Sequence, residues 1–207
     1  GYRAEHCVVN TIYSFVKQRV RPAKILLWLA EDEFSEHNLP QDLVFLKQYG
    51  LDIRFCEDLR SYKKLIPTLR LKEKVNVMTV DDDIYYSSNM IETFLKTAAL
   101  HPHAIIVGHA FMPLLKAQGA FAPYTSWKPL FHVQRDEEYD HHLVFPIGYS
   151  GIYYPASIFD DEVLTFYTYF YDGVEHFADM VKLMVPGAED IPYCLPSAED
   201  DEVDDED

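Results

Sequence analysis

The chain has 207 residues, of which 48% are hydrophobic and 14% aromatic, so it can bury a core of one large or two small domains and is not disordered over most of its length. It carries 34 acidic against 18 basic residues, a net charge of −16, which argues against non-specific binding to nucleic acid or to anionic membranes. No apolar run approaches the roughly 20 residues that are needed to span a bilayer, so we expect no transmembrane segment.

The first half of the chain alternates between predicted helices and predicted strands. Helices are expected at residues 4–19, 38–49, 61–71 and 87–100, with Ser61 as an N-cap and Gly50 as a C-cap. Short apolar runs predict buried strands at residues 24–29, 51–55, 75–80 and 104–108. This order is typical of an α/β domain with a mostly parallel central sheet flanked by helices.

The second half of the chain is less regular. Residues 111–142 are rich in aromatic residues, proline and histidine, and they predict a long loop or an irregular hairpin. A strand is expected within residues 144–154, followed by helices at residues 160–171 and 174–185.

The end of the chain is strongly acidic. Residues 199–207 contain eight acidic side chains and no basic one, and we expect a disordered acidic tail there, after a single domain over residues 1–198. Three scattered cysteines, Cys7, Cys56 and Cys194, are odd in number and lack zinc-binding spacing. This usage is typical of a reducing compartment, so we expect a cytoplasmic protein.

Three adjacent carboxylates follow the predicted strand at residues 75–80. Asp81, Asp82 and Asp83 repel one another unless a cation or strong donors compensate their charge. In an extended segment Asp81 and Asp83 would face the same side. Carboxylate oxygens suit Mg²⁺ or Mn²⁺, and ligands bind beyond the carboxyl ends of parallel strands. We therefore predict a divalent metal site with Asp83 and Asp81 as ligands; a solvated acidic turn is the alternative.

A basic cluster lies at the start of the predicted helix at residues 61–71. Arg60, Lys63 and Lys64 stand out in an acidic chain, and helix N-termini favour anions. The plain alternative is a solubilising surface. Together with a metal site, a pocket for a diphosphate is the simpler interpretation.

These segments together resemble one family of enzymes. The runs KILLWL (24–29), SYKKLIP (61–67) and TVDDDIY (79–85) occur in the order and spacing of GT-A fold glycosyltransferases of bacteria and large viruses. The run GYSGIYYP (148–155) is similar to that family's glycine-containing segment. The resemblance covers about residues 2–185. It implies a GT-A type nucleotide-diphospho-sugar transferase fold, and a viral enzyme that modifies capsid glycans would fit it.

The resemblance also implies an activity. It implies a metal-dependent, inverting glycosyltransferase that moves a sugar from a nucleotide-diphosphate donor, most simply a UDP-sugar, to a hydroxyl acceptor on a glycan or glycoprotein. Asp83 would bind Mn²⁺ or Mg²⁺ directly, Asp81 would contact the ribose or the metal through water, and Asp82 would lie near the donor. Tyr124 and Trp127, in the region 111–142, are candidates for stacking on a sugar ring.

Further donor contacts follow from the same resemblance. Lys64, Lys63 and Arg60 would contact the nucleotide or its phosphates. Asp58 would accept a hydrogen bond from the base, and Arg3 would lie near the base.

The chain departs from the family in two places. The family's first strand is absent from the sequence or shortened, and Tyr2 and Arg3 match the end of it. The late acidic motif reads ADMVKL (178–183), with Met180 in place of the second acid. Asp179 keeps the family position and is our candidate for the general base, with Glu175 and Asp172 as the nearest substitutes.

Two other functions stay open. A nucleotidyltransferase or phosphohydrolase would use the same carboxylates, lysines and Mg²⁺. A degenerate domain that binds nucleotide sugars without turnover is the other, and Met180 is its best support.

Overall fold

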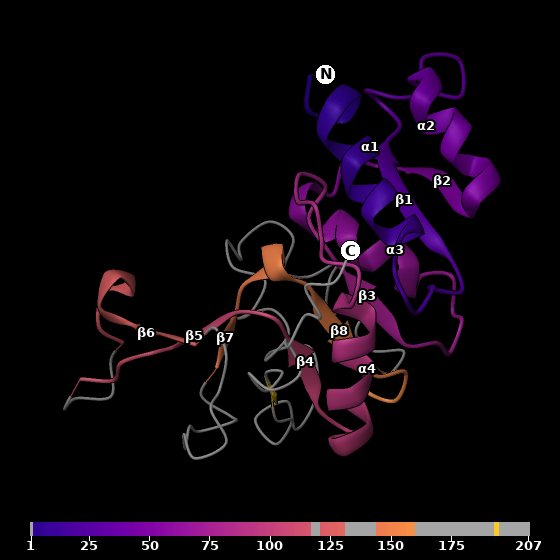
Figure 1. Cartoon of the computed structure of the whole chain (residues 1–207). Coiled ribbons are helices and arrows are strands. Elements are labelled where there is room, and N and C mark those ends of the chain that lie inside the picture. Colours follow the sequence, from indigo (N-terminus) through magenta and orange to yellow (C-terminus); the bar gives the residue numbers. More distant parts are fainter. Residues whose placement is uncertain (1, 117–120, 131–143, 160–192, 195–207) are drawn as a thin grey trace. The chain divides into compact units, whose positions relative to one another are not determined.

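The computed structural model describes residues 2–116, 121–130, 144–159 and 193–194, with side chains from Cys7 to Phe159 within those ranges. These residues form a mixed α/β structure (Figure 1). Its helices are α1 (Tyr2–Val16), α2 (Gln41–Leu46), α3 (Ile66–Leu69) and α4 (Met90–Leu100), and its 3₁₀ helices are η1 (Lys47–Tyr49), η2 (Arg60–Lys64), η3 (Tyr124–Ser126) and η4 (Gly148–Ser150). Its strands are β1 (Ile25–Ala30), β2 (Leu51–Cys56), β3 (Val77–Thr79), β4 (Ile105–Val107), β5 (Ala110–Met112), β6 (Lys128–Leu130), β7 (Phe145–Pro146), β8 (Ile152–Tyr154) and β9 (Tyr193–Cys194).

The chain divides into two compact units that are interleaved in sequence. The first unit comprises residues 1–73 and 81–92, and the second comprises residues 74–80 and those from 93 onward. The segment with the three aspartates therefore belongs to the same unit as the basic cluster. The single domain over residues 1–198 stays a prediction, and the predicted helices at 160–171 and 174–185 and the acidic tail lie outside the described residues.

The first unit is built on the parallel pair β1 and β2. The two strands pair over their whole length, from Ile25 opposite Leu51 to Ala30 opposite Cys56. α2 and η1 connect them, and Gly50 ends η1 in the left-handed conformation with φ of 99°, which glycine adopts without strain. The predicted strands at 24–29 and 51–55 and the Gly50 C-cap are therefore confirmed.

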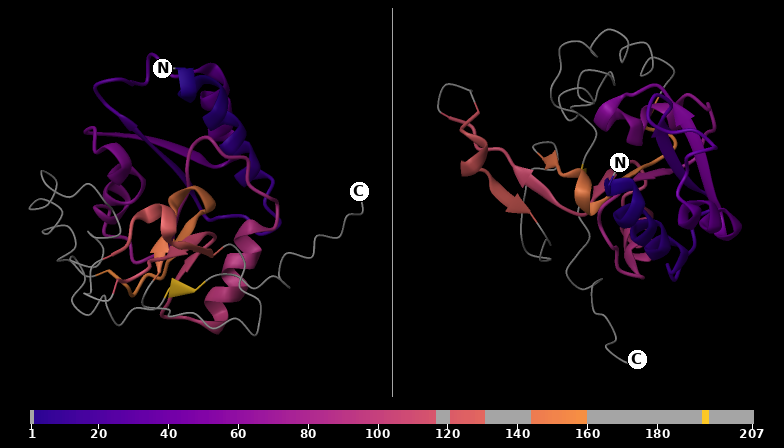
Figure 2. Two further views of the ribbon diagram at one scale, coloured as in Figure 1. Left: turned by 90° about the vertical axis from the view of Figure 1, so that its left-hand side faces the viewer. Right: turned by 90° about the horizontal axis from the view of Figure 1, so that it is seen from above.

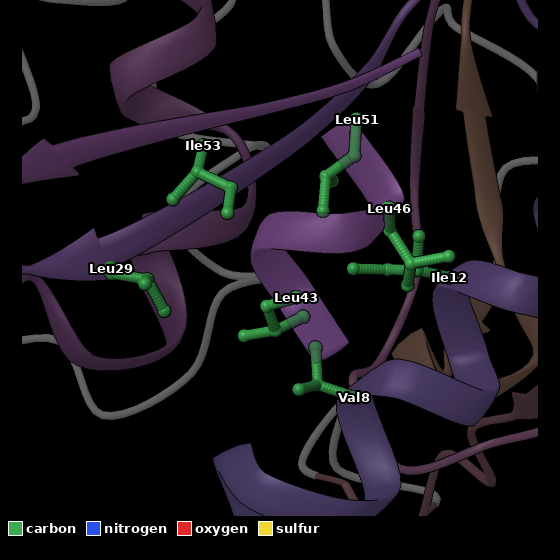
Figure 3. Packing of buried hydrophobic residues seen from close by; sticks show 7 residues of the cluster. All are labelled: Val8, Ile12, Leu29, Leu43, Leu46, Leu51 and Ile53. Atoms are coloured by element: carbon green, nitrogen blue, oxygen red, sulfur yellow. The ribbon is translucent and has the colours of Figure 1, made fainter. Parts of the chain in front are cut away.

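A hydrophobic core fills the space between the β1–β2 pair and two helices. Val8 and Ile12 from α1 and Leu43 and Leu46 from α2 meet three strand residues, Leu29, Leu51 and Ile53 (Figure 3). Leu43 is fully buried, at 0% exposed, and burying such a side chain stabilises the fold by about 1.5–3 kcal/mol.

The opposite face of β1 is also covered. The indole Nε1–H of Trp28 donates to the Thr68 hydroxyl of α3 at 2.9 Å, and the Arg54 guanidinium lies over the same indole ring, 5.7 Å from its centroid. A continuous apolar run is typical of a strand that is covered on both faces.

The second unit contains two sheets, and neither is mostly parallel. One has the strand order β3-β8-β4-β9 and the other β6-β5-β7. β8 runs antiparallel to both of its neighbours, β3 and β4, and all three of its residues are buried. Among the described strands only the pairs β1–β2 and β4–β9 are parallel.

The mixed α/β class is thus confirmed, but the prediction of a mostly parallel central sheet is wrong for the described strands. An apolar run reports that a strand is buried and carries no information on its direction. η4 directly precedes β8, and Gly151 between them has a φ of 88°. The strand expected at 75–80 is also shorter than predicted, since β3 covers Val77–Thr79 and Val75 is 49% exposed.

The aromatic-rich region after residue 110 forms an irregular hairpin in its described part. β5 pairs antiparallel with β6, from Ala110 opposite Leu130 to Met112 opposite Lys128, and an isolated bridge joins Leu115 to Phe121. β5 and β6 lie side by side as the two strands of this hairpin (Figure 2). Of the two structures predicted for this region, the hairpin is the one observed for the described residues 110–116 and 121–130.

Candidate functional site

The basic cluster is shaped by an aspartate at its start. Asp58 Oδ1 accepts a hydrogen bond from the Arg60 N–H at 3.0 Å and lies 2.8 Å from the Lys63 ammonium group. Lys63 first, and then the Arg60 N–H, lower the pKa of the Asp58 carboxyl. Arg60 is held in the left-handed region, at φ of 49°, which an arginine rarely adopts.

This arrangement corrects one prediction about the cluster. Ser61 does not precede the helix as its N-cap: it lies inside η2, and Leu59 occupies the N-cap position. The carboxylate of Asp58 takes over the role of binding a free backbone N–H at this end. The predicted contact of Asp58 with a nucleotide base stays a prediction.

An ion pair joins the basic cluster to the aspartates. The Lys64 ammonium group donates directly to the Asp81 carboxylate. Both side chains remain partly exposed, at 37% for Lys64 and 26% for Asp81. Such a pair contributes about 0–1 kcal/mol to stability, so either group can change partner at little cost when a ligand arrives.

The three aspartates lie on a turn and do not continue β3. Asp81 follows Val80 in irregular backbone, and Asp82 and Asp83 form a turn in which both are exposed. The expectation that Asp81 and Asp83 share one side of an extended segment is therefore wrong. Exposure on a turn lets water screen the repulsion between the adjacent carboxylates.

The carboxylate oxygens of this turn suit a hard cation that takes only some of its ligands from the protein. Within the described residues no three His, Cys, Asp or Glu side chains converge as a metal-binding group. Mg²⁺ is usually bound through one or two carboxylates, with waters and substrate phosphates in the remaining positions. Asp81 and Asp83 fit that smaller contribution, and their role as ligands stays a prediction.

The turn is anchored by a tyrosine that sequence reasoning missed. The hydroxyl oxygen of Tyr86 accepts a hydrogen bond from the Asp81 N–H at 3.0 Å. Tyr86 is 6% exposed, and burial, followed by the nearby aspartates, raises the pKa of its phenol well above the usual range. The phenol is therefore neutral at physiological pH. The position of Tyr86, five residues after Asp81, could have suggested this contact, but tyrosine is so common in this chain that a single one does not stand out.

A buried glutamine two residues after α1 binds the segment that follows Tyr86. The Gln18 side chain donates to the Ser87 carbonyl at 2.5 Å and accepts from the Ile91 N–H at 3.0 Å. One residue further, the Arg19 N–H donates to the Ser88 carbonyl at 2.8 Å. Sequence reasoning missed Gln18 because a polar residue at the end of a helix is ordinarily exposed.

The second unit holds a buried histidine beside exposed aromatic rings. His109, 5% exposed, directly follows β4 and Gly108, and its Nδ1 lies 2.6 Å from the Tyr149 hydroxyl. Burial lowers the pKa of His109, which favours the neutral ring.

The two candidate sugar-stacking residues lie in contact with each other. Tyr124 and Trp127 meet edge to face, with ring centroids 5.2 Å apart, and the Trp127 indole N–H donates to the Ala122 carbonyl at 2.9 Å. Tyr124 is 49% exposed. Stacking on a sugar stays a prediction for both.

The remaining predicted site residues are outside the structural description. The candidate general base Asp179 and its substitutes Glu175 and Asp172 fall within residues 160–192, and Arg3 lies on α1 in a stretch whose side chains are not described. Their roles stay predictions.

A scan against models of known protein families finds no match for this chain, and a search of curated proteins finds none either. In the described part of the chain, none of the helices has the length and apolar character of a membrane span. The function is therefore inferred from the chemistry of the residues around Lys64 and Asp81.

Proposed function

We propose that this chain is a metal-dependent glycosyltransferase that uses a nucleotide-diphosphate sugar, most simply a UDP-sugar, and a hydroxyl acceptor on a glycan or glycoprotein. The observation that supports it is the ion pair between Lys64 and Asp81. A metal diphosphate needs carboxylates for the cation and ammonium groups for the phosphate oxygens, and this pair brings both kinds of group together in one unit.

The residues of the chain would divide the work as follows. Lys64 and Lys63 would leave their aspartate partners and donate to phosphate oxygens. Asp81 and Asp83 would take the cation, Mn²⁺ or Mg²⁺, which when bound offsets the charge that develops on the departing diphosphate. Asp82 and Arg60 would contact the donor nearby, without a role in the chemical step.

The transfer itself makes one bond and breaks one. The acceptor oxygen bonds to the anomeric carbon as the bond from that carbon to the diphosphate oxygen breaks, and the nucleoside diphosphate leaves. The proton of the acceptor hydroxyl passes to a general base, for which Asp179 is the candidate. A direct displacement of this kind inverts the anomeric configuration.

We extend the proposal to the finer structural predictions. They are a GT-A type nucleotide-diphospho-sugar transferase fold, with the first unit as its nucleotide-binding part, and a cytoplasmic location. The parallel pair β1–β2, followed by the basic cluster after β2, supports the fold, because ligands of α/β sheets bind beyond the carboxyl ends of strands.

A nucleotide-sugar screen tests the proposal. The full chain is incubated with a panel of UDP-, GDP- and CMP-sugars, with Mn²⁺ or with a chelator, and its melting temperature and the released nucleotide are measured. A donor that binds the folded chain raises the melting temperature, and we expect this for a UDP-sugar only with the metal present. Release of nucleoside diphosphate supports a glycosyltransferase, whereas release of pyrophosphate or phosphate from nucleotides supports a nucleotidyltransferase or phosphohydrolase. Stabilisation without any turnover, with acceptors present, supports the degenerate binding domain.

A further inference from the structure

We infer that Tyr86 and Gln18 are positioning residues, which hold the aspartate turn at Asp81 in place before any ligand binds. What the turn binds rests on the proposed function, but the attachment itself is a property of the folded chain. We call these two side chains and their backbone contacts the α1 clamp.

Tyr86 fixes the first aspartate through its backbone. Its hydroxyl oxygen accepts the Asp81 N–H at 3.0 Å, so residues 81–86 form a closed loop that carries Asp82 and Asp83. The bond leaves the Asp81 carboxylate available for Lys64. The backbone is held while the side chain keeps its freedom to bind a cation.

The position of the Tyr86 hydroxyl is itself set by packing. The ring contacts Phe15 of α1, with centroids 5.2 Å apart, and both residues are buried, at 6% and 7% exposed. The neighbouring Tyr85 is 62% exposed. The two adjacent tyrosines therefore differ in their surroundings: Tyr86 packs against α1, and Tyr85 is exposed to solvent.

Gln18 extends the attachment to the start of α4. Its amide is 4% exposed and satisfies both of its ends, since Nε2 donates to the Ser87 and Ser14 carbonyls and Oε1 accepts from the Ile91 N–H. A buried amide is costly unless it is hydrogen-bonded in this way. Phe15 of α1, together with Gln18 and Arg19 just after the helix, thus contacts the chain between residues 86 and 91.

The clamp works against the repulsion between the aspartates. Water screens the repulsion between the three adjacent carboxylates only in part, and the remaining repulsion favours a turn that opens and separates their charges. If only a fraction of the molecules hold the turn in the conformation that binds the ligand, the apparent affinity falls to that fraction of its full value. By keeping the turn closed, the clamp lowers the free energy that binding of a metal diphosphate must spend on ordering the turn.

Amide hydrogen exchange of the full chain tests the clamp without any ligand. Tyr86→Phe removes only the hydroxyl, and Tyr85→Phe is the matched control with the same chemical change at an exposed ring. Loss of a hydrogen bond of about 1 kcal/mol corresponds to an increase of about 5-fold in exchange. We expect this at residues 81–83 in Tyr86→Phe, with β1 and β2 unchanged and with no change in Tyr85→Phe. Equal exchange at 81–83 in wild type and Tyr86→Phe, or an equal increase in both variants, would overturn the inference.

A second variant keeps the test decisive if Tyr86→Phe unfolds. Gln18→Glu preserves the acceptor for Ile91 and removes the donor to Ser87. We expect faster exchange at residues 86–91, with β1 and β2 protected as in wild type. Unchanged exchange there would contradict the inference.

Calorimetric titration with UDP and Mn²⁺ then separates the clamp from the proposed function. We expect Tyr86→Phe to weaken Mn²⁺-dependent UDP binding by up to about 5-fold, the same factor by which opening of the turn increases, and Tyr85→Phe to leave it unchanged. If the wild-type chain does not bind UDP with Mn²⁺, the proposed function fails while the exchange data still decide the clamp. If wild type binds and Tyr86→Phe binds equally well, the clamp does not position the site.

Discussion

The ammonium group of Lys64 donates to the carboxylate of Asp81, although 17 residues separate them along the chain. The chain leaves the first unit after residue 73, forms β3 in the second unit and returns at residue 81. The ion pair therefore depends on the chain's return to the first unit. Because the two charges belong to separate side chains, each can be removed by its own substitution and its contribution to ligand binding measured alone.

Removal of Asp83 should abolish metal-dependent donor binding. Asp83 lies exposed on the turn, so Asp83→Ala leaves no cavity, and we expect it to remove most of the Mn²⁺-dependent affinity for a UDP-sugar in calorimetric titration. Asp32→Ala, at an exposed turn elsewhere in the first unit, is the control and should bind as wild type. Equal donor binding by wild type in chelator and in Mn²⁺ would show that the aspartates hold no metal.

Removal of Lys64 should weaken binding of the diphosphate and spare the nucleoside. We expect Lys64→Ala to cost about 1–3 kcal/mol in affinity for UDP, the contribution of a hydrogen bond to a charged group, with little change for uridine. Lys47 forms a comparable surface pair with Glu36 and is similarly exposed, at 35%, so Lys47→Ala is the matched control. An equal loss for uridine and UDP would assign Lys64 a structural role.

Stability should fall as the pH drops below about 6.5, the ordinary pKa of histidine, because of His109. Burial lowers the pKa of His109 in the folded state, so the unfolded chain binds the proton more tightly and acid favours unfolding. Urea unfolding over this range should show a shallower pH dependence for His109→Gln than for wild type. His37→Gln, at an exposed position, should keep the wild-type slope. Identical slopes for His109→Gln and wild type would contradict the prediction.

A methyl group at Gly108 should destabilise the second unit. A Cβ at this position would lie 2.4 Å from the Ser150 carbonyl oxygen, whereas a Cβ at Gly50 would meet no atom within 4 Å. Overpacking costs about 1–3 kcal/mol, and the left-handed conformation costs a residue with a Cβ about 1–2 kcal/mol. We expect the Gly108→Ala variant to lose more unfolding free energy than Gly50→Ala, which carries the strain alone. The reverse order in urea denaturation would be inconsistent with the packing around Ser150.

Asp179→Asn should remove acceptor transfer and keep donor binding. The donor contacts proposed for Asp81 and Lys64 do not involve residue 179, and loss of a general base slows transfer by about 10²–10⁴-fold. Single-turnover assays of Glu175→Gln and Asp172→Asn, made alongside, identify the base among the three. Full transfer by Asp179→Asn, with a loss in one of the other two, would move the base to that residue.

Several features of this protein follow from sequence alone because they depend on neighbouring residues. A continuous apolar run predicted that β1 is buried. α1 and α2 pack on one face of this strand, and Thr68 of α3 and Arg54 contact Trp28 on the other. Gly50 was predicted as a C-cap because the left-handed conformation at a helix end favours glycine. The adjacency of three aspartates is likewise visible in the sequence, together with the electrostatic cost of leaving them uncompensated.

Only the tertiary structure decided strand direction and the surroundings of the aspartates. All three residues of β8 are buried, yet the strand runs antiparallel between β3 and β4, because burial alone does not determine the direction of a strand. The partners of Asp81 are Lys64 and Tyr86, and the residues around Tyr86 are held by Phe15 and Gln18 of α1 and the turn after it. Apart from the bond between Asp81 and Tyr86, these contacts join residues far apart in sequence, and no local propensity specifies them. Each depends on where the packing of the unit places two distant segments.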